Sequence, residues 1–230
     1  MITAEAVRVA LSGVRDPEID ESLTDLGFVA GVDVDGADVR VHLRLPTYFC
    51  APNFAFLMVA DAYDAVSGVP GIRHAEIVLD GHFASDTINT GVAAQAGFVH
   101  TFAGEAVAEL DRLRADFLRK AVLAGTDLVC RPLLAAGTAI GELAALTLGE
   151  VPPSPELDRL RRRRSELGLP AGDADPLLID PATGAAVGVD ALPLHLRRAR
   201  ATRVGIEANA GICRGMLRVR YGTKGEGEQS

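Results

Sequence analysis

One cysteine, Cys50, lies between two segments of regular structure and is the residue best placed for chemistry. Residues 39–45 before it alternate apolar and polar side chains, as in a strand with one buried face. Apolar residues after it recur at three- and four-residue steps, and Pro52 suits the first turn of the helix that this spacing predicts. The N–H groups at a helix N-terminus favour the thiolate, which binds metals and attacks electrophiles. Cys50 is therefore a candidate metal ligand, with a small buried residue as the alternative.

Acidic residues are concentrated upstream of Cys50, within the segment RDPEIDESLTD at 15–25. A cluster of this kind could hold a metal ion or a proton. The alternative is a solvated loop in which Asp16 and Asp25 accept hydrogen bonds from backbone N–H groups. The sequence favours the loop.

Further candidate metal ligands lie in three other segments. His82, accompanied by Asp86, follows a predicted strand at 72–79, where a small sheet could bring it near Cys50; the alternative is a surface histidine beside a turn. Cys130 and Cys213 have no CxxC or CxxH neighbour, and such a cysteine is more often part of a core. Soft metals nevertheless prefer several thiolates, and three cysteines from three segments could converge. The glycines around Cys213 place it ahead of Cys130.

The first 90 residues predict a two-layer α+β domain. A helix within 4–14 precedes a hairpin around Asp35-Gly36, a dipeptide typical of a type I′ turn. The Cys50 helix then extends to Gly68, and the strand at 72–79 completes the order helix, hairpin, helix, strand. Both helices are expected on one face of the sheet.

Residues 91–230 predict a helix-rich region with one or two short hairpins, possibly a region that binds a client protein. The expected helices are 102–123, ending at Gly125, then 135–146, one capped by Ser154 and Pro155, and 191–200. A hairpin is expected around 181–184, strands at 202–208 and 215–222, and a disordered tail at 223–230. Arginines 161–164 are expected to form a solvated face or to contact an acidic partner.

Composition narrows the class of protein. A net charge of −8 argues against general nucleic-acid binding, which depends on an excess of lysine and arginine. No apolar run is long enough to cross a bilayer. The N-terminal residues lack a basic n-region, a long apolar core and a plausible cleavage site, so no signal peptide is expected. Three widely spaced cysteines do not form a disulfide framework, so the reducing cytoplasm is the expected compartment. Whether the protein forms a homodimer is left open.

An ordered set of short motifs resembles the MIP18 family, also called the DUF59 or PaaD-like domain. DPE at 16–18 and TDLGFV at 24–29 precede the hairpin, a T-x-x-C-x-P segment runs from Thr47 to Pro52, and VPGI precedes the last strand. The resemblance covers roughly residues 3–90. It implies a factor for iron–sulfur maturation with Cys50 as its key thiol, and it carries over Asp16, Glu18, Asp25 and Thr47 as motif positions.

The resemblance implies a function without catalytic turnover. Iron or an iron–sulfur cluster would be held transiently at Cys50 and passed to a client apo-metalloprotein, for which an iron-dependent monooxygenase is plausible. Two alternatives remain: a metal-free chaperone or adaptor for an iron oxygenase subunit, and an enzyme with Cys50 as nucleophile. The enzyme would need a base near Cys50, and only His82 could arrive through the fold.

Overall fold

A computed structural model describes residues 2–222 as two compact units. The first unit contains the chain up to Asp111 together with the segment from Asn209 onward, and the second contains Arg112–Ala208. The structure therefore places the division between the units elsewhere than the boundary predicted at residue 90. Residues 91–111 and the last turns of the C-terminal helix belong with the first unit. The tail at 223–230, expected to be disordered, lies outside the described residues.

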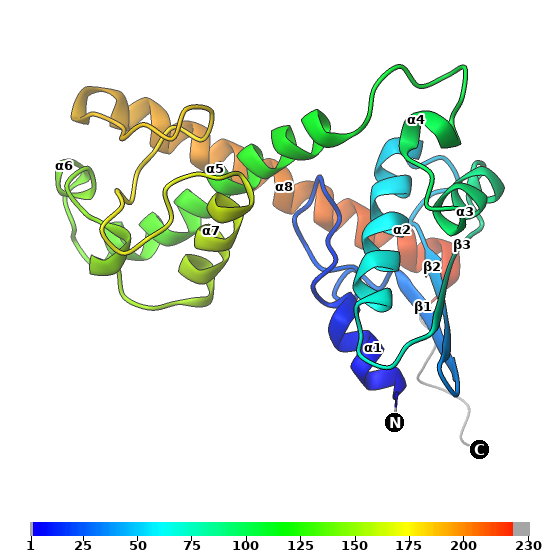
Figure 1. Cartoon of the computed structure of the whole chain (residues 1–230). Helices are drawn as coiled ribbons and strands as arrows, with labels where there is room; N and C mark the ends of the chain where they lie inside the picture. The colour runs from blue at the N-terminus through cyan, green and yellow to red at the C-terminus, as the bar shows by residue number, and fades with distance from the viewer. Residues whose placement is uncertain (1, 223–230) are drawn as a thin grey trace. The chain divides into compact units, whose positions relative to one another are not determined.

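The first unit is built on a small mixed sheet (Figure 1). Strands β1 (Val29–Asp35) and β2 (Asp38–Arg44) are antiparallel, and β3 (His74–Asp80) pairs with β2 in parallel. The strand order is β1-β2-β3. Because β2 and β3 run in the same direction, the loops that follow them leave the same edge of the sheet, and these loops carry Cys50 and His82.

Helices cover the apolar side of this sheet. The alternation predicted for β2 is present, since Val39, Val41 and Leu43 are buried. Helix α1 (Ala4–Leu11) contacts β1, and α2 (Pro52–Ser67) contacts β3. Two short helices, α3 (Ser85–Ala93) and α4 (Phe98–Thr101), follow β3. The α+β class expected from the sequence is confirmed.

The turn of the hairpin differs from its prediction by one residue. Asp35 pairs with Asp38, so the two turn residues are Gly36 and Ala37. Only Gly36 has a positive φ, 61°, whereas a type I′ turn requires positive φ at both central residues. Asp35 thus ends β1, and glycine supplies the one left-handed conformation that the turn requires.

The second unit packs helices and irregular loops around its own apolar core. Its helices are α5 (Asp111–Ala135), α6 (Ile140–Leu143) and α7 (Pro155–Glu166), with short 3-10 turns η1 (Leu148–Glu150) and η2 (Val189–Ala191). Helix α5 begins nine residues later than predicted from Phe102 and continues through Gly125. Gly125 lies against Leu160 of α7, so it permits close helix packing and does not end the helix. The helix expected at 135–146 is reduced to α6.

The largest correction concerns the end of the chain. Instead of a short helix and two strands, residues Leu192–Tyr221 form one helix, α8. The valines at 204 and 219 suggested strands in short windows, but the buried positions of this segment recur at helical spacing. None of the helices within residues 2–222 is long and apolar enough to cross a membrane.

The arginine run at 161–164 is also not the solvated face that was expected. Arg162 is exposed, but Arg163 and Arg164 are buried. Arg164 donates hydrogen bonds to the carbonyl oxygens of Pro170, Pro176 and Leu177, so it joins α7 to the following loop. Four consecutive helix positions point in different directions, and two of them are buried.

Candidate functional site

The Cys50 loop is held from two sides. Cys50 lies two residues before α2, whose N-cap is Ala51 and whose first residue is Pro52, as predicted. The Thr47 hydroxyl donates to the Cys50 sulfur over 3.5 Å. His82, from the loop after β3, donates from Nε2 to the backbone carbonyl oxygen of Cys50 over 2.7 Å. Cys50 itself is half-buried.

His82 uses both ring nitrogens on the backbone. The Ala84 N–H donates to Nδ1 over 3.2 Å, so Nδ1 carries no proton and Nε2 holds the proton given to Cys50. The ring is only 3% exposed, which differs from the alternative of a surface histidine. In this arrangement His82 positions the Cys50 loop through the carbonyl group, and its contact is with that oxygen and not with the sulfur.

Exposed aromatic rings surround the Cys50 loop. Tyr48, Phe49 and Phe83 are all exposed, and Phe49 exposes 73% of its surface. The Tyr48 and Phe83 rings are 6.2 Å apart, and the Phe83 N–H donates to the Tyr48 carbonyl oxygen. We call these three residues the aromatic rim. The aromatic rim was not predicted, although the sequence places Tyr48 and Phe49 directly before the loop cysteine.

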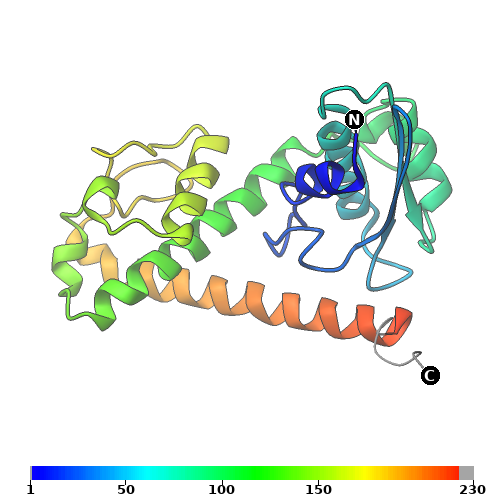
Figure 2. The ribbon, with the colours of Figure 1, turned by 90° about the horizontal axis from the view of Figure 1, so that it is seen from below.

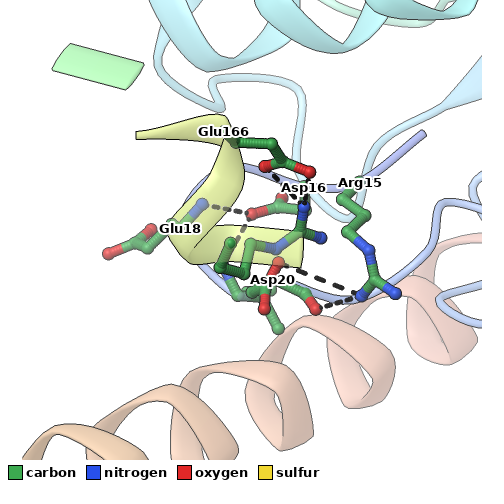
Figure 3. Close-up of polar contacts among 7 residues, drawn as sticks. Arg15, Asp16, Glu18, Asp20 and Glu166 are labelled. Carbon is green, nitrogen blue, oxygen red and sulfur yellow. Dashed lines mark hydrogen bonds and ion pairs between the residues drawn. The ribbon is translucent and has the colours of Figure 1, made fainter. Parts of the chain in front are cut away.

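The acidic loop at 15–25 is ordered by its own backbone (Figure 3). Asp16 Oδ1 accepts hydrogen bonds from the N–H groups of Glu18 and Ile19, at 2.9 and 3.0 Å, as the loop interpretation expected. Arg15 donates to the Asp20 carbonyl oxygen over 2.5 Å. Burial is the main cause that raises the pKa of Asp16 above its ordinary value, and the charges of Glu18 and Glu21 add to it.

Cys213 reaches this loop from α8. Burial raises the pKa of the Cys213 thiol to about 11, and the neighbouring charges of Asp16, Cys50 and Glu18 contribute. Cys213, Cys50, Asp16 and Glu18 all belong to the first unit. Asn209 and Arg214, which flank Cys213 in α8, contact Glu18 and Glu21 of the acidic loop.

The remaining predicted ligands and motif residues are either buried in the second unit or exposed. Cys130 is 1% exposed in the apolar core of the second unit, and burial raises its pKa to about 12, as for a core cysteine. Asp25 and Asp86 are exposed, Asp86 in the first turn of α3. Within residues 2–222, no three histidine, cysteine or acidic side chains are grouped closely enough to form a metal site.

Asp16→Asn is expected to lower the pKa of Cys213. The amide keeps an oxygen that can accept from Glu18 and Ile19, and it removes a negative charge that disfavours the thiolate. The measurement is the rate of Cys213 alkylation against pH, resolved by peptide mass spectrometry. Asp25→Asn is the matched control, since Asp25 is not among the charges that act on Cys213. An unchanged profile for Asp16→Asn would contradict the expected coupling.

Comparisons with known proteins find relatives of the N-terminal part of the chain, which lies in the first unit. A family model described as "Iron-sulfur cluster assembly protein" matches residues 4–79. An uncharacterized protein of Methanocaldococcus jannaschii is 32% identical over 90 residues, which are 39% of this chain and 93% of that protein. An iron-sulfur cluster carrier protein of Synechocystis sp. is 36% identical over 77 residues, which are 34% of this chain and 21% of that carrier. No solved structure gives a significant match.

The fold and the loop cysteine define a small α+β domain with a positioned thiol. Through residues 4–79 the chain belongs to the iron–sulfur cluster assembly protein family, and the resemblance to the MIP18 domain is confirmed. The chain covers only 21% of the cluster carrier's own length, so the likeness to that protein concerns this domain alone. The family match ends at residue 79, well before the second unit begins at Arg112.

Proposed function

We propose that the protein is an iron–sulfur maturation factor that holds iron or an iron–sulfur cluster transiently through Cys50 and delivers it to a client apo-metalloprotein. The observation that carries this proposal is the position of Cys50. It is a half-buried thiol in the family domain, and its loop is fixed by Thr47 and His82. Soft thiolate ligands suit iron–sulfur clusters.

Incomplete ligation supports transfer. Since no described group of three ligands exists, the cargo would keep positions at which a client's ligands could replace those of the carrier. Cargo binding would release the Cys50 proton, because the thiolate is the metal ligand. An iron-dependent monooxygenase is the client class that we favour, and the reducing cytoplasm, the expected compartment, would keep the thiol available.

A role without catalytic turnover fits the surroundings of Cys50. In the described part of the chain, the hydrogen bond to the Cys50 sulfur comes from Thr47, whereas His82 contacts the carbonyl oxygen. A cysteine nucleophile requires a base within hydrogen-bond reach of its sulfur. The arrangement supports a carrier over a cysteine hydrolase.

The second candidate function is a metal-free chaperone or adaptor for an iron oxygenase subunit. The aromatic rim is the observation that favours it, because exposed aromatic side chains are enriched where proteins contact one another. A carrier would use the same rim to contact its client. The two functions therefore differ in whether Cys50 binds cargo.

The deciding measurement is the iron and sulfide content after anaerobic reconstitution. We expect near-stoichiometric iron in the wild-type protein and its loss in Cys50→Ala, with sulfide distinguishing a cluster from a bare ion. Cys130→Ala is the matched control, since that thiol lies in the core of the other unit and should leave the iron content unchanged. Absence of iron from the wild-type protein would reject the carrier and favour the adaptor.

A further inference from the structure

One arginine at the end of α8 contacts both loops that carry the candidate site. Arg220 donates from Nη1 to the Leu45 carbonyl oxygen over 3.1 Å and from Nη2 to the Gly81 carbonyl oxygen. Leu45 directly follows β2 and Gly81 directly follows β3, so they are the first residues of the loops that carry Cys50 and His82. Figure 2 shows the red end of α8 beside the first unit, to which it belongs. Arg220 thus joins the two loops where they leave the sheet.

The guanidinium of Arg220 is held by its neighbours. Its central carbon lies 5.0 Å from the centre of the Tyr221 ring, and the guanidinium carbon of Arg44 lies 4.9 Å from the same ring centre. Cation–π contacts of this kind favour one orientation of an otherwise flexible side chain. Gly81 has a φ of 60°, and a side chain there would meet Arg220 Nη2 at 3.0 Å. Glycine therefore permits the turn after β3 and leaves room for the guanidinium.

Two further hydrogen bonds join the same two loops beyond the point at which Arg220 connects them. His82 Nε2 donates to the Cys50 carbonyl oxygen over 2.7 Å, and the Phe83 N–H donates to the Tyr48 carbonyl oxygen over 3.0 Å. Both bonds require the loops to stay within hydrogen-bond distance of each other. A change in the spacing at the start of the loops would therefore be felt at Cys50.

The connection made by Arg220 depends on its charge and its shape. The Leu45 and Gly81 carbonyl oxygens both carry partial negative charge, so they repel each other when they converge. A guanidinium between them replaces this repulsion with two charge-assisted hydrogen bonds, and its planar set of donors can serve both oxygens at once. Loss of the cation would remove one of the three connections between the loops.

We propose that Arg220 is a positioning residue for Cys50. By joining the loops after β2 and β3, it keeps His82 within reach of the Cys50 carbonyl group and so holds the thiol in place. The inference rests on the proposed function for its effect on cargo, which a positioned thiol would retain longer. Arg220 lies outside residues 4–79, so this support comes from a part of the chain that the family match does not include.

The first test is the rate of Cys50 alkylation by iodoacetamide in the metal-free, full-length protein, read by peptide mass spectrometry. Arg220→Met removes both donors, and the rate should rise by at least about threefold because the loop is less restrained. Arg220→Lys restores a cation with three donors, so the rate should return to within about twofold of the wild-type value. Cys130, buried in the second unit, is the internal reference. Arg220 is half-buried in the last turn of its helix, so both variants should fold.

Arg214→Met is the matched control, because it removes a different connection between the same helix and the first unit. Arg214 forms an ion pair with Glu21 of the acidic loop. Its loss should leave the Cys50 rate within about twofold of the wild-type value. An equal rise in Arg214→Met and Arg220→Met would overturn the inference, since general attachment of α8 would then explain both. A wild-type rate in Arg220→Met would overturn it as well.

The second test measures how fast iron leaves the anaerobically reconstituted protein for a chelator. Arg220→Met should release iron at least about threefold faster than the wild-type protein, and Arg220→Lys and Arg214→Met should not. Equal release rates in Arg220→Met and the wild type would overturn the role of Arg220 toward cargo and leave the carrier intact. A wild-type protein that holds no iron would reject the carrier, and the alkylation rates would then decide alone whether Arg220 positions Cys50.

Discussion

His82→Ala is expected to destabilise the first unit by about 2–4 kcal/mol and to raise the alkylation rate of Cys50. The substitution leaves the Cys50 carbonyl oxygen and the Ala84 N–H without their partner, and it opens a cavity where a buried ring was. Each unpaired buried group costs about 1–3 kcal/mol. The Cys50 loop also loses its connection to the loop after β3, so its thiol becomes more reactive.

Tyrosine fluorescence measures this effect selectively. The chain has three tyrosines, Tyr48, Tyr63 and Tyr221, and no tryptophan, and all three belong to the first unit. Urea unfolding followed by this signal therefore reports on the unit that contains His82. The matched control is His74→Ala, because His74 is exposed and should change stability by less than about 0.5 kcal/mol. Equal midpoints for the two variants would show that His82 does not hold the loop.

Arg164→Met is expected to destabilise the second unit by about 3–5 kcal/mol. The substitution retains the length of the side chain but leaves the carbonyl oxygens of Pro170, Pro176 and Leu177 without their donor. Burial lowers the pKa of Arg164 to about 10, so the guanidinium remains charged at neutral pH and its bonds to these oxygens are charge-assisted.

Arg162→Met is the control for this prediction, since Arg162 is exposed on the same helix. Hydrogen exchange of the α7 amides measures the loss, and tyrosine fluorescence shows whether the first unit is affected. Faster exchange of α7 in Arg164→Met alone is the expected result. Similar exchange rates in the two variants would mean that the buried arginine contributes little to the stability of its unit.

The elements within residues 4–80 could be predicted from sequence because their patterns are local. Three local patterns each identify an element without knowledge of its partners. They are the alternation in β2, the helical spacing after Cys50 and the glycine at the hairpin. Helix α8 could not be predicted in this way. Its glycines, including Gly205, Gly211 and Gly215, lower helix propensity, and its buried positions are defined by contacts with residues far away in the sequence.

The candidate site was likewise predictable only where it depends on local patterns. The approach of His82 to Cys50 follows from two parallel strands that end at one edge, so it was predictable. Only the neighbouring glycines place Cys213 ahead of Cys130 in the sequence, because both cysteines lack a neighbouring ligand motif. Long-range packing separates them: α8 brings one to the acidic loop, and the core of the second unit encloses the other.

The contribution of the end of α8 to the first unit has a consequence for synthesis. The ribosome makes the chain from its N-terminus, so Thr47, Cys50 and His82 emerge early and can fold with their sheet. The residues from Asn209 onward emerge only after all of Arg112–Ala208 has been made. The contacts of Arg214 with Glu21 and of Arg220 with Leu45 and Gly81 can therefore form only late. The first unit is complete only on chains whose translation has passed the second unit.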